Sequence, residues 1–204
     1  GFNLTRARQA EIGVKASLPR DLGEATLALF DIERTDALTR DPLNPSLTVQ
    51  IGKQSARGVE VALALRPAPR WTVEINGSLL NAKFDNFNES VGGVAVSRAG
   101  NLPPDVPEKL ANLWATYRLN DGWQLGGGAR YVGKRSANNA NTVFMDAYTT
   151  VDAWVTYRLK PGELRLAVRN LTDEVYANRS YGTNGSQFIL GEPRAVELSY
   201  SARF

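Results

Sequence analysis

The 204-residue sequence contains no cysteine and no histidine. Without them the chain cannot form disulfides, zinc ribbons, thiol nucleophiles or a Ser-His-Asp triad. A transition-metal site would have to use carboxylates alone, and carboxylates are poor ligands for such metals. The carboxylates, lysines, serines and tyrosines that remain form no convincing acid–base cluster, so we expect neither an enzyme nor a bound cofactor.

The sequence also lacks a large excess of charge of one sign and long apolar runs. Lys and Arg number 24 against 21 Asp and Glu, and because these charges are scattered, no nucleic-acid partner is indicated. No run of 18 apolar residues exists, so no transmembrane helix is expected. A transmembrane β-barrel is compatible with this composition, because its lipid-facing residues alternate with polar ones. Residues 1–6 lack the apolar stretch of a signal peptide, which predicts a processed leader or a piece of a longer protein.

Glycine and proline punctuate the whole chain, and the segments between them alternate between apolar and polar residues. A period of two indicates β-strands. Most segments have about ten residues, the length that a tilted strand needs to cross a bilayer and more than the usual soluble strand has. The nine predicted strands are 8–18, 24–35, 56–66, 71–84, 109–119, 123–133, 147–159, 163–172 and 194–204.

The connections between these strands alternate in length. Tight turns at one end and long loops at the other are typical of outer-membrane barrels. The predicted short turns are 19–23, 67–70, 120–122 and 160–162, and the predicted long loops are 36–55, 85–108, 134–146 and 173–193.

The alternation alone fits two architectures. A soluble barrel points its apolar face inward, whereas a membrane barrel points that face at lipid. Tyr117 and Tyr157 precede short turns, and Trp71 and Trp123 follow them, where an aromatic girdle at the bilayer edge belongs. The alternative is that these four are ordinary core aromatics of a soluble β-rich binding domain.

The last predicted strand has a distinctive apolar face. Alternating apolar residues that end on a terminal Phe resemble the C-terminal assembly signal of bacterial outer-membrane proteins. The residues that carry this resemblance are Leu198, Tyr200, Ala202 and Phe204.

A family resemblance then becomes specific. Residues 168–176 and 191–194, with the terminal Phe, resemble the C-terminal region of TonB-dependent outer-membrane receptors, and 30–36, 58–60 and 103–107 are similar to their siderophore-receptor branch. The resemblance implies an all-β, antiparallel up-and-down transmembrane barrel of about 22 strands around an N-terminal plug. Residues 1–204 would supply its C-terminal part, about nine strands, without the plug and the earlier strands.

The same resemblance implies a function and a location. The receptor would take up ferric siderophores across the outer membrane of a Gram-negative bacterium, energised by a TonB-ExbB-ExbD complex that contacts the missing N-terminal part. Iron would arrive as substrate inside its chelator, and the other partners would be the lipid bilayer and the outer-membrane assembly machinery. A passive outer-membrane channel and a soluble β-rich binding domain are the alternatives.

Two sets of candidate site residues follow. Aromatic and arginine side chains of the long loops and upper lumen suit compact ferric chelates, with loop packing as the alternative for each. A second set of arginines lies on polar faces near the short turns or the chain end, where it would face the plug, with snorkelling or pairing with neighbouring acids as the alternative. The first set is Arg98, Arg135, Phe144, Tyr148, Tyr176, Arg179, Tyr181 and Phe188, and the second is Arg66, Arg118, Arg158 and Arg203.

Two further motifs receive structural interpretations. Residues 170–173, Asn-Leu-Thr-Asp, predict a strand-to-loop transition, because Asn and Asp side chains bond readily to the nearby backbone. Residues 126–128 are three glycines within a predicted strand, and with no helix after them they form no dinucleotide loop.

Overall fold

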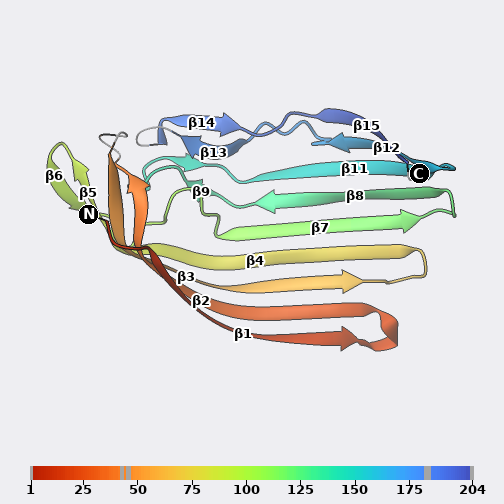
Figure 1. Cartoon of the computed structure of the whole chain (residues 1–204), viewed down its shortest axis with the longest axis horizontal. Helices are drawn as coiled ribbons and strands as arrows, with labels where there is room; N and C mark the ends of the chain where they lie inside the picture. Colours follow the sequence, from red (N-terminus) through yellow and green to blue (C-terminus); the bar gives the residue numbers. More distant parts are fainter. Residues whose placement is uncertain (1, 42–43, 45–46, 182–184, 203–204) are drawn as a thin grey trace.

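The structure, a computed structural model, describes residues 2–41, 44, 47–181 and 185–202. One antiparallel meander dominates it, and each strand pairs with its neighbours along the chain, as Figure 1 shows. Its nine strands are β1 (Arg6–Leu18), β2 (Gly23–Arg40), β3 (Thr48–Leu65), β4 (Trp71–Asn86), β7 (Lys109–Arg118), β8 (Trp123–Val132), β11 (Tyr148–Arg158), β12 (Gly162–Arg169) and β15 (Ala195–Ala202). All nine predicted strands are confirmed.

The short turns lie together at one end of the sheet and the long loops at the other (Figure 1). Local chemistry explains the turns. The Asn120 side-chain oxygen accepts the N–H groups of Gly122 and Trp123, both at 2.9 Å, which closes the turn between β7 and β8. The first turn holds a short 3-10 helix, η1 (Pro19–Asp21), and among the residues described no helix is long and apolar enough to span a membrane.

The predicted loop 36–55 is wrong in extent. Strands β2 and β3 continue through most of it, with Arg40 paired to Thr48. The polar residues of this stretch suggested a loop, but Ala37 and Ile51 pack with Phe84 and Phe87 in a small buried cluster. Burial of these four side chains supports strand pairing well beyond the point where the alternation weakens.

Three small hairpins within the long loops were not expected from the sequence. They are too short to show a hydrophobic period. They pair β5 (Asn88–Val91) with β6 (Val94–Ser97), β9 (Arg135–Ser136) with β10 (Phe144–Met145), and β13 (Ala177–Tyr181) with β14 (Gln187–Leu190).

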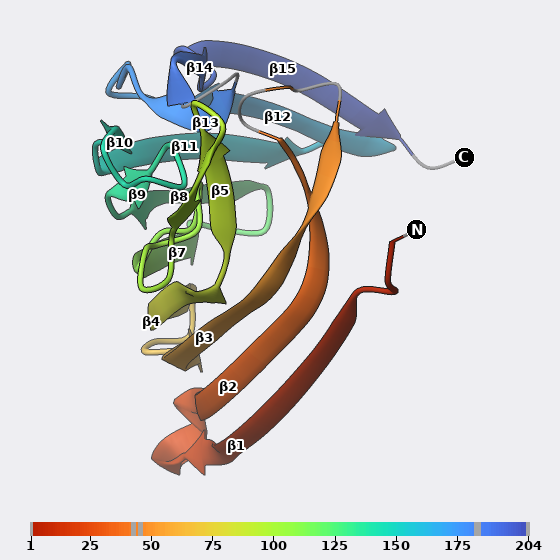
Figure 2. The same ribbon diagram turned by 90° about the vertical axis from the view of Figure 1, so that its left-hand side faces the viewer.

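The register of the sheet gathers the apolar residues on one face. Val155, for example, lies between Leu125 on β8 and Leu166 on β12. This face stays open, with Leu113 45% and Leu198 68% exposed. The sheet curves as a wall whose free edges are β1 and β15 (Figure 2). An apolar face of this size without a covering layer disagrees with a soluble barrel that packs its apolar side chains in a dry centre.

The other face is polar and carries two indoles. Trp154 lies over Gly126 and Trp114 over Gly128, and a Cβ on either glycine would come within 2.5 Å of the ring. The guanidinium of Arg165, on β12, also lies over the Trp154 ring, 4.5 Å from its centre. Gly126 and Gly128 of β8 therefore leave room for bulky side chains of the strands beside them.

The substitution Gly126→Val tests the packing of the Trp154 indole on Gly126. The added side chain would collide with the Trp154 indole, and we expect the free energy of unfolding to fall by about 1–3 kcal/mol, as for other overpacked sites. Urea unfolding of the full protein in detergent micelles measures the change. In a Trp154→Ala background the same substitution should cost much less, and an equal cost there would show that the indole is not the obstacle.

Candidate functional site

An aromatic border lies at the turn end of the apolar face. Trp71 and Tyr117 are cross-strand partners with ring centres 4.8 Å apart, and Trp123 and Tyr157 repeat this arrangement at 4.5 Å. Both tryptophans are exposed. The predicted clustering of these four aromatics beside the short turns is therefore confirmed. Rings that are apolar in body and polar at one atom are favoured at a membrane–water interface.

A charged border lies at the opposite end of the same face. Arg57 pairs with Asp31 at 2.7 Å, and Lys53 pairs with Glu33 at 2.8 Å. Along β4 the stretch from Trp71 to Asn81 separates the two borders. At about 3.3 Å per residue and a tilt of about 40° it covers about 25 Å of depth, the height of the apolar band of an outer-membrane barrel.

Three of the four predicted plug-facing arginines come together near the short turns. Arg66 and Arg118 line one hollow of about 480 Å³, and Arg118 and Arg158 line a second of about 160 Å³. Among the described residues no carboxylate lies within ion-pair distance of these three, although Asp21 lines the first hollow and Asp121 and Glu163 line the second. Their contact with a plug stays a prediction. Arg203 lies outside the described residues.

The predicted assembly signal lies partly on β15. Leu198 and Tyr200 pair with Leu166 and Leu164 of β12 and point to the apolar face, whereas Phe204 lies outside the described residues. Ala202 ends the strand opposite Gly162. The role of these residues in assembly stays a prediction.

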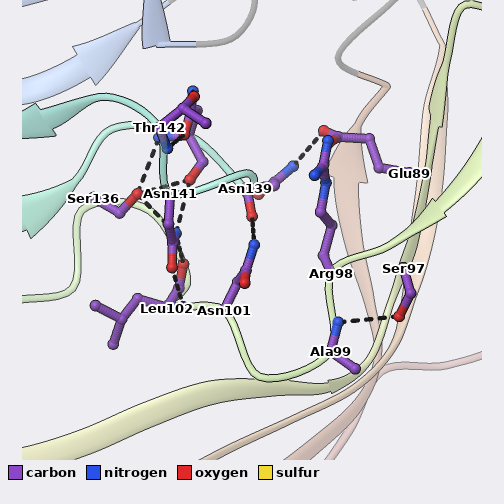
Figure 3. Close-up of polar contacts among 11 residues, drawn as sticks. Glu89, Ser97, Arg98, Ala99, Asn101, Leu102, Ser136, Asn139, Asn141 and Thr142 are labelled. Atoms are coloured by element: carbon purple, nitrogen blue, oxygen red, sulfur yellow. Dashed lines mark hydrogen bonds and ion pairs between the residues drawn. The ribbon is translucent and has the colours of Figure 1, made fainter.

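At the other end of the sheet, the loops 87–108 and 133–147 are joined by hydrogen bonds, drawn in Figure 3. Asn141 binds the backbone of Leu102 twice: its side-chain oxygen accepts the Leu102 N–H at 2.7 Å and its amide donates to the Leu102 carbonyl at 2.9 Å. The Asn101 amide donates to the Asn139 carbonyl at 2.7 Å. These loops therefore form one connected structure rather than separate arms.

Four of the predicted ligand-contacting residues are wholly or partly buried at this end of the sheet. Arg98 pairs at 2.6 Å with the buried carboxylate of Glu89. Arg135 is only 5% exposed. Tyr148 is buried and stacks on Tyr176 with ring centres 4.0 Å apart. Burial also raises the pKa of the Tyr176 phenol, which keeps that group neutral. The structure thus gives each of these four a packing contact.

The other four predicted residues are accessible. Lys134 lies 4.5 Å above the Phe144 ring, and Phe144 and Phe188 are partly exposed. The Arg179 side chain is 71% exposed and Tyr181 is 58% exposed, both on β13. These residues can touch a molecule that approaches the loops, and their contact with ligand stays a prediction.

Asn170 explains the predicted strand-to-loop transition, which is confirmed. It adopts a positive φ of 47°, and its side-chain amide donates to the carbonyls of Glu174 and Glu192 at 2.9 and 3.0 Å. Its side-chain oxygen accepts the Glu174 N–H at 2.9 Å. The bond that Asp105 accepts from the Ser180 N–H and the bonds between Asn141 and Leu102 were not predicted, because nothing local in a sequence identifies the distant partner. The sequence offered one signal for such contacts, the Asn and Asp residues in the loops, because these residues tolerate a positive φ and bond readily to backbone groups.

A family model of a β-barrel matches most of the chain. The model for the TonB-dependent receptor-like β-barrel matches residues 2–171. The chain belongs to the TonB-dependent receptor β-barrel family. Its apolar band accordingly lies in the outer membrane, and the family consists of receptors and transporters rather than enzymes.

Curated relatives are receptors of the same kind. The chain is 31% identical over its whole length to the ferrichrome outer membrane transporter/phage receptor of Escherichia coli K12, covering 27% of that protein. It is 29% identical over 97% of its length to the ferrioxamine receptor of Yersinia enterocolitica, covering 28% of it. The chain thus spans little more than a quarter of the length of these relatives.

Solved structures agree with the fold. The siderophore receptor PiuA of Acinetobacter baumannii superposes on 95% of the chain with a TM-score of 0.79 and 26% identity. The ferric-catecholate import receptor Fiu of E. coli K12, in its closed form, covers all of the chain with a TM-score of 0.74 and 27% identity. The chain covers 28% of each of these structures.

A single charged substitution tests which face of the sheet meets lipid. Leu113 pairs with Ile75 midway between the two borders, so Leu113→Arg would place a guanidinium in hydrocarbon. We expect the free energy of folding of the whole receptor into lipid vesicles to weaken by about 2–4 kcal/mol. The matched control is Ser78→Arg on the polar face, opposite Glu60, which should change it by less than about 1 kcal/mol. Equal losses would contradict the assignment of faces.

Proposed function

We propose that the chain is part of an outer-membrane receptor that takes up ferric siderophore complexes with energy supplied through TonB. The observation that carries this proposal is the family membership together with relatives named for ferrichrome and ferrioxamine. The loop end of the barrel is the surface at which such a complex would arrive from outside.

In this proposal, residues 1–204 form the C-terminal part of a larger barrel. Two observations support it: the chain spans little more than a quarter of its curated relatives, and both β1 and β15 are open edges. The plug and the earlier strands would come from the rest of the receptor. The TonB-ExbB-ExbD complex would act on the N-terminal part, and the outer-membrane assembly machinery would read the face of β15.

The proposed ligand surface consists of the exposed aromatic and cationic residues of the loops. Guanidinium groups bind carboxylate and catecholate oxygens through directed hydrogen bonds, and aromatic rings pack on the flat surfaces of a chelate. Iron is substrate here, carried by its chelator, and the receptor itself needs no resident cofactor. The accessible candidates are Phe144, Arg179, Tyr181 and Phe188.

Binding to a panel of iron chelates tests the function. We expect the whole receptor in detergent to bind at least one ferric hydroxamate, catecholate or carboxylate siderophore, and cells that carry it to import that complex only with TonB. The test measures tryptophan fluorescence quenching and ⁵⁵Fe uptake. Uptake that is unchanged without TonB would indicate a passive channel. Binding of only another kind of nutrient would remove the siderophore assignment and leave the family intact.

The arginines near the short turns give a second test. In the proposal, Arg118 and Arg158 hold the plug through its acidic groups, so Arg118→Glu with Arg158→Glu should loosen it. We expect about tenfold greater leakage of a small antibiotic through the whole receptor, from the loss of charge-assisted contacts worth about 1.5–3 kcal/mol. Lys160→Glu, a charge reversal in the turn that follows β11, serves as the control. Leakage equal to that of the control would count against plug docking at these residues.

A further inference from the structure

The β13–β14 hairpin stands at the loop end of the barrel and carries two of the accessible candidates. Arg179 and Tyr181 alternate with Asn178 and Ser180 along β13, and Ile189 is the cross-strand partner of Arg179. Neighbours across an antiparallel pair share a face. The exposed side chains of Arg179, Tyr181 and Ile189 therefore form one surface, which we name the hairpin face.

Arg135 binds the backbone at the start of β13. Its guanidinium donates to the carbonyls of Asn178 at 2.7 Å and Ala177 at 2.5 Å, and it lies 5.5 Å from the centre of the Tyr148 ring. Within the described residues no carboxylate pairs with it, although the side chain is 95% buried. A buried charge is costly unless hydrogen bonds satisfy its donors. Arg135 uses Nη1 and Nη2 on the backbone of β13, whereas its buried Nε–H has no partner within the described residues.

Asp105 holds the same strand at its other end. Its carboxylate accepts the N–H of Ser180 at 2.8 Å and the hydroxyl of Ser180 at 3.0 Å. Its own N–H donates to the Ser136 carbonyl at 2.9 Å, so one residue joins three long loops. Asp105 has a positive φ of 63°, a conformation that Asp and Asn adopt more readily than other side chains.

The contact between Asp105 and Arg179 is looser. Their nearest charged atoms are 4.0 Å apart, and the Arg179 side chain is largely in solvent. An exposed pair at this distance contributes little attraction. The carboxylate therefore biases the direction of the guanidinium while leaving its donors available to an anionic ligand.

We infer that Asp105 and Arg135 are positioning residues of the ligand surface, which fix β13 so that the hairpin face meets the chelate. This inference rests on the proposed function and names the part of the loops that would recognise the ligand. A guanidinium, a phenol and an aliphatic side chain on one rigid face suit a complex with anionic oxygens and a flat or apolar flank. A rigid face also binds more tightly than a mobile one, because less conformational entropy is lost on binding.

The experiment follows the hairpin and the ligand separately in the whole receptor. Spin labels at Leu190→Cys on β14 and Leu79→Cys on β4, both exposed, report the hairpin position as a distance distribution in a cysteine-free background. Dissociation constants are measured for the same panel of ferric hydroxamate, catecholate and carboxylate complexes. Asp105→Ala removes the acceptor, whereas Asp105→Asn keeps an acceptor oxygen and tolerates the same φ.

The matched control is Asp173→Ala. Asp173 also has a positive φ, accepts the N–H of Arg194 at 2.9 Å and pairs with its guanidinium at 3.6 Å, but it makes these contacts outside β13. We expect Asp105→Ala to broaden the distance distribution and to weaken chelate binding about tenfold, and we expect Asp105→Asn and Asp173→Ala to stay within about threefold of wild type. Ser180→Ala, a smaller change to the same contact, should move both readouts in the direction of Asp105→Ala.

The outcomes test two claims separately: that β13 is held in position by these contacts, and that the hairpin face recognises the chelate. An unchanged distance distribution in both Asp105→Ala and Ser180→Ala would overturn the positioning role. A broadened distribution with unchanged affinity for every chelate that wild type binds would overturn the recognition role of the hairpin and leave the proposed function standing. If the wild-type receptor binds none of the chelates, the proposed function fails and the recognition role fails with it, whatever the labels report.

Discussion

Backbone pairing in a medium without water is the constraint on which this molecule depends. In hydrocarbon every N–H and C=O group must find a partner within the protein, and an antiparallel meander provides one at every residue of its inner strands. The side-chain period of two then sends alternate residues to lipid and to the interior. The register from β1 to β15 keeps these two sets apart, so Val155 meets Leu125 and Leu166 rather than a polar neighbour.

Beyond the bilayer the same chain is held together differently. Water is available there, so the apolar face no longer dictates the conformation, and long connections are stabilised by side chains that bond to the backbone of other loops. Asn141 and Asp105 do this from a positive φ, and Asn170, also at a positive φ, bonds to the backbone within its own loop. The only described hydrophobic cluster at this end joins the extended tips of β2 and β3 to Phe84 and Phe87.

The sequence predicts the two regions unequally well. Strands within the bilayer follow from a local pattern, so all nine were predicted, and Trp71 and Trp123 marked the turn end of the apolar face. The loop end depends on distant partners. Local polarity suggested a loop where β2 and β3 in fact continue, and no local pattern showed that Arg135 is buried against β13. No local pattern distinguishes an arginine that faces solvent from one that binds a carbonyl 42 residues away.

The open sheet also determines whether the number of additional strands that close the barrel is odd or even. Because nine strands alternate in direction, β1 and β15 run the same way, from the loop end to the turn end. If these two edges met, they would pair in parallel and break the alternation that allows tight turns. An uninterrupted antiparallel cylinder can therefore be finished only by an odd number of additional strands, which makes the total even, as in single-chain bacterial outer-membrane barrels.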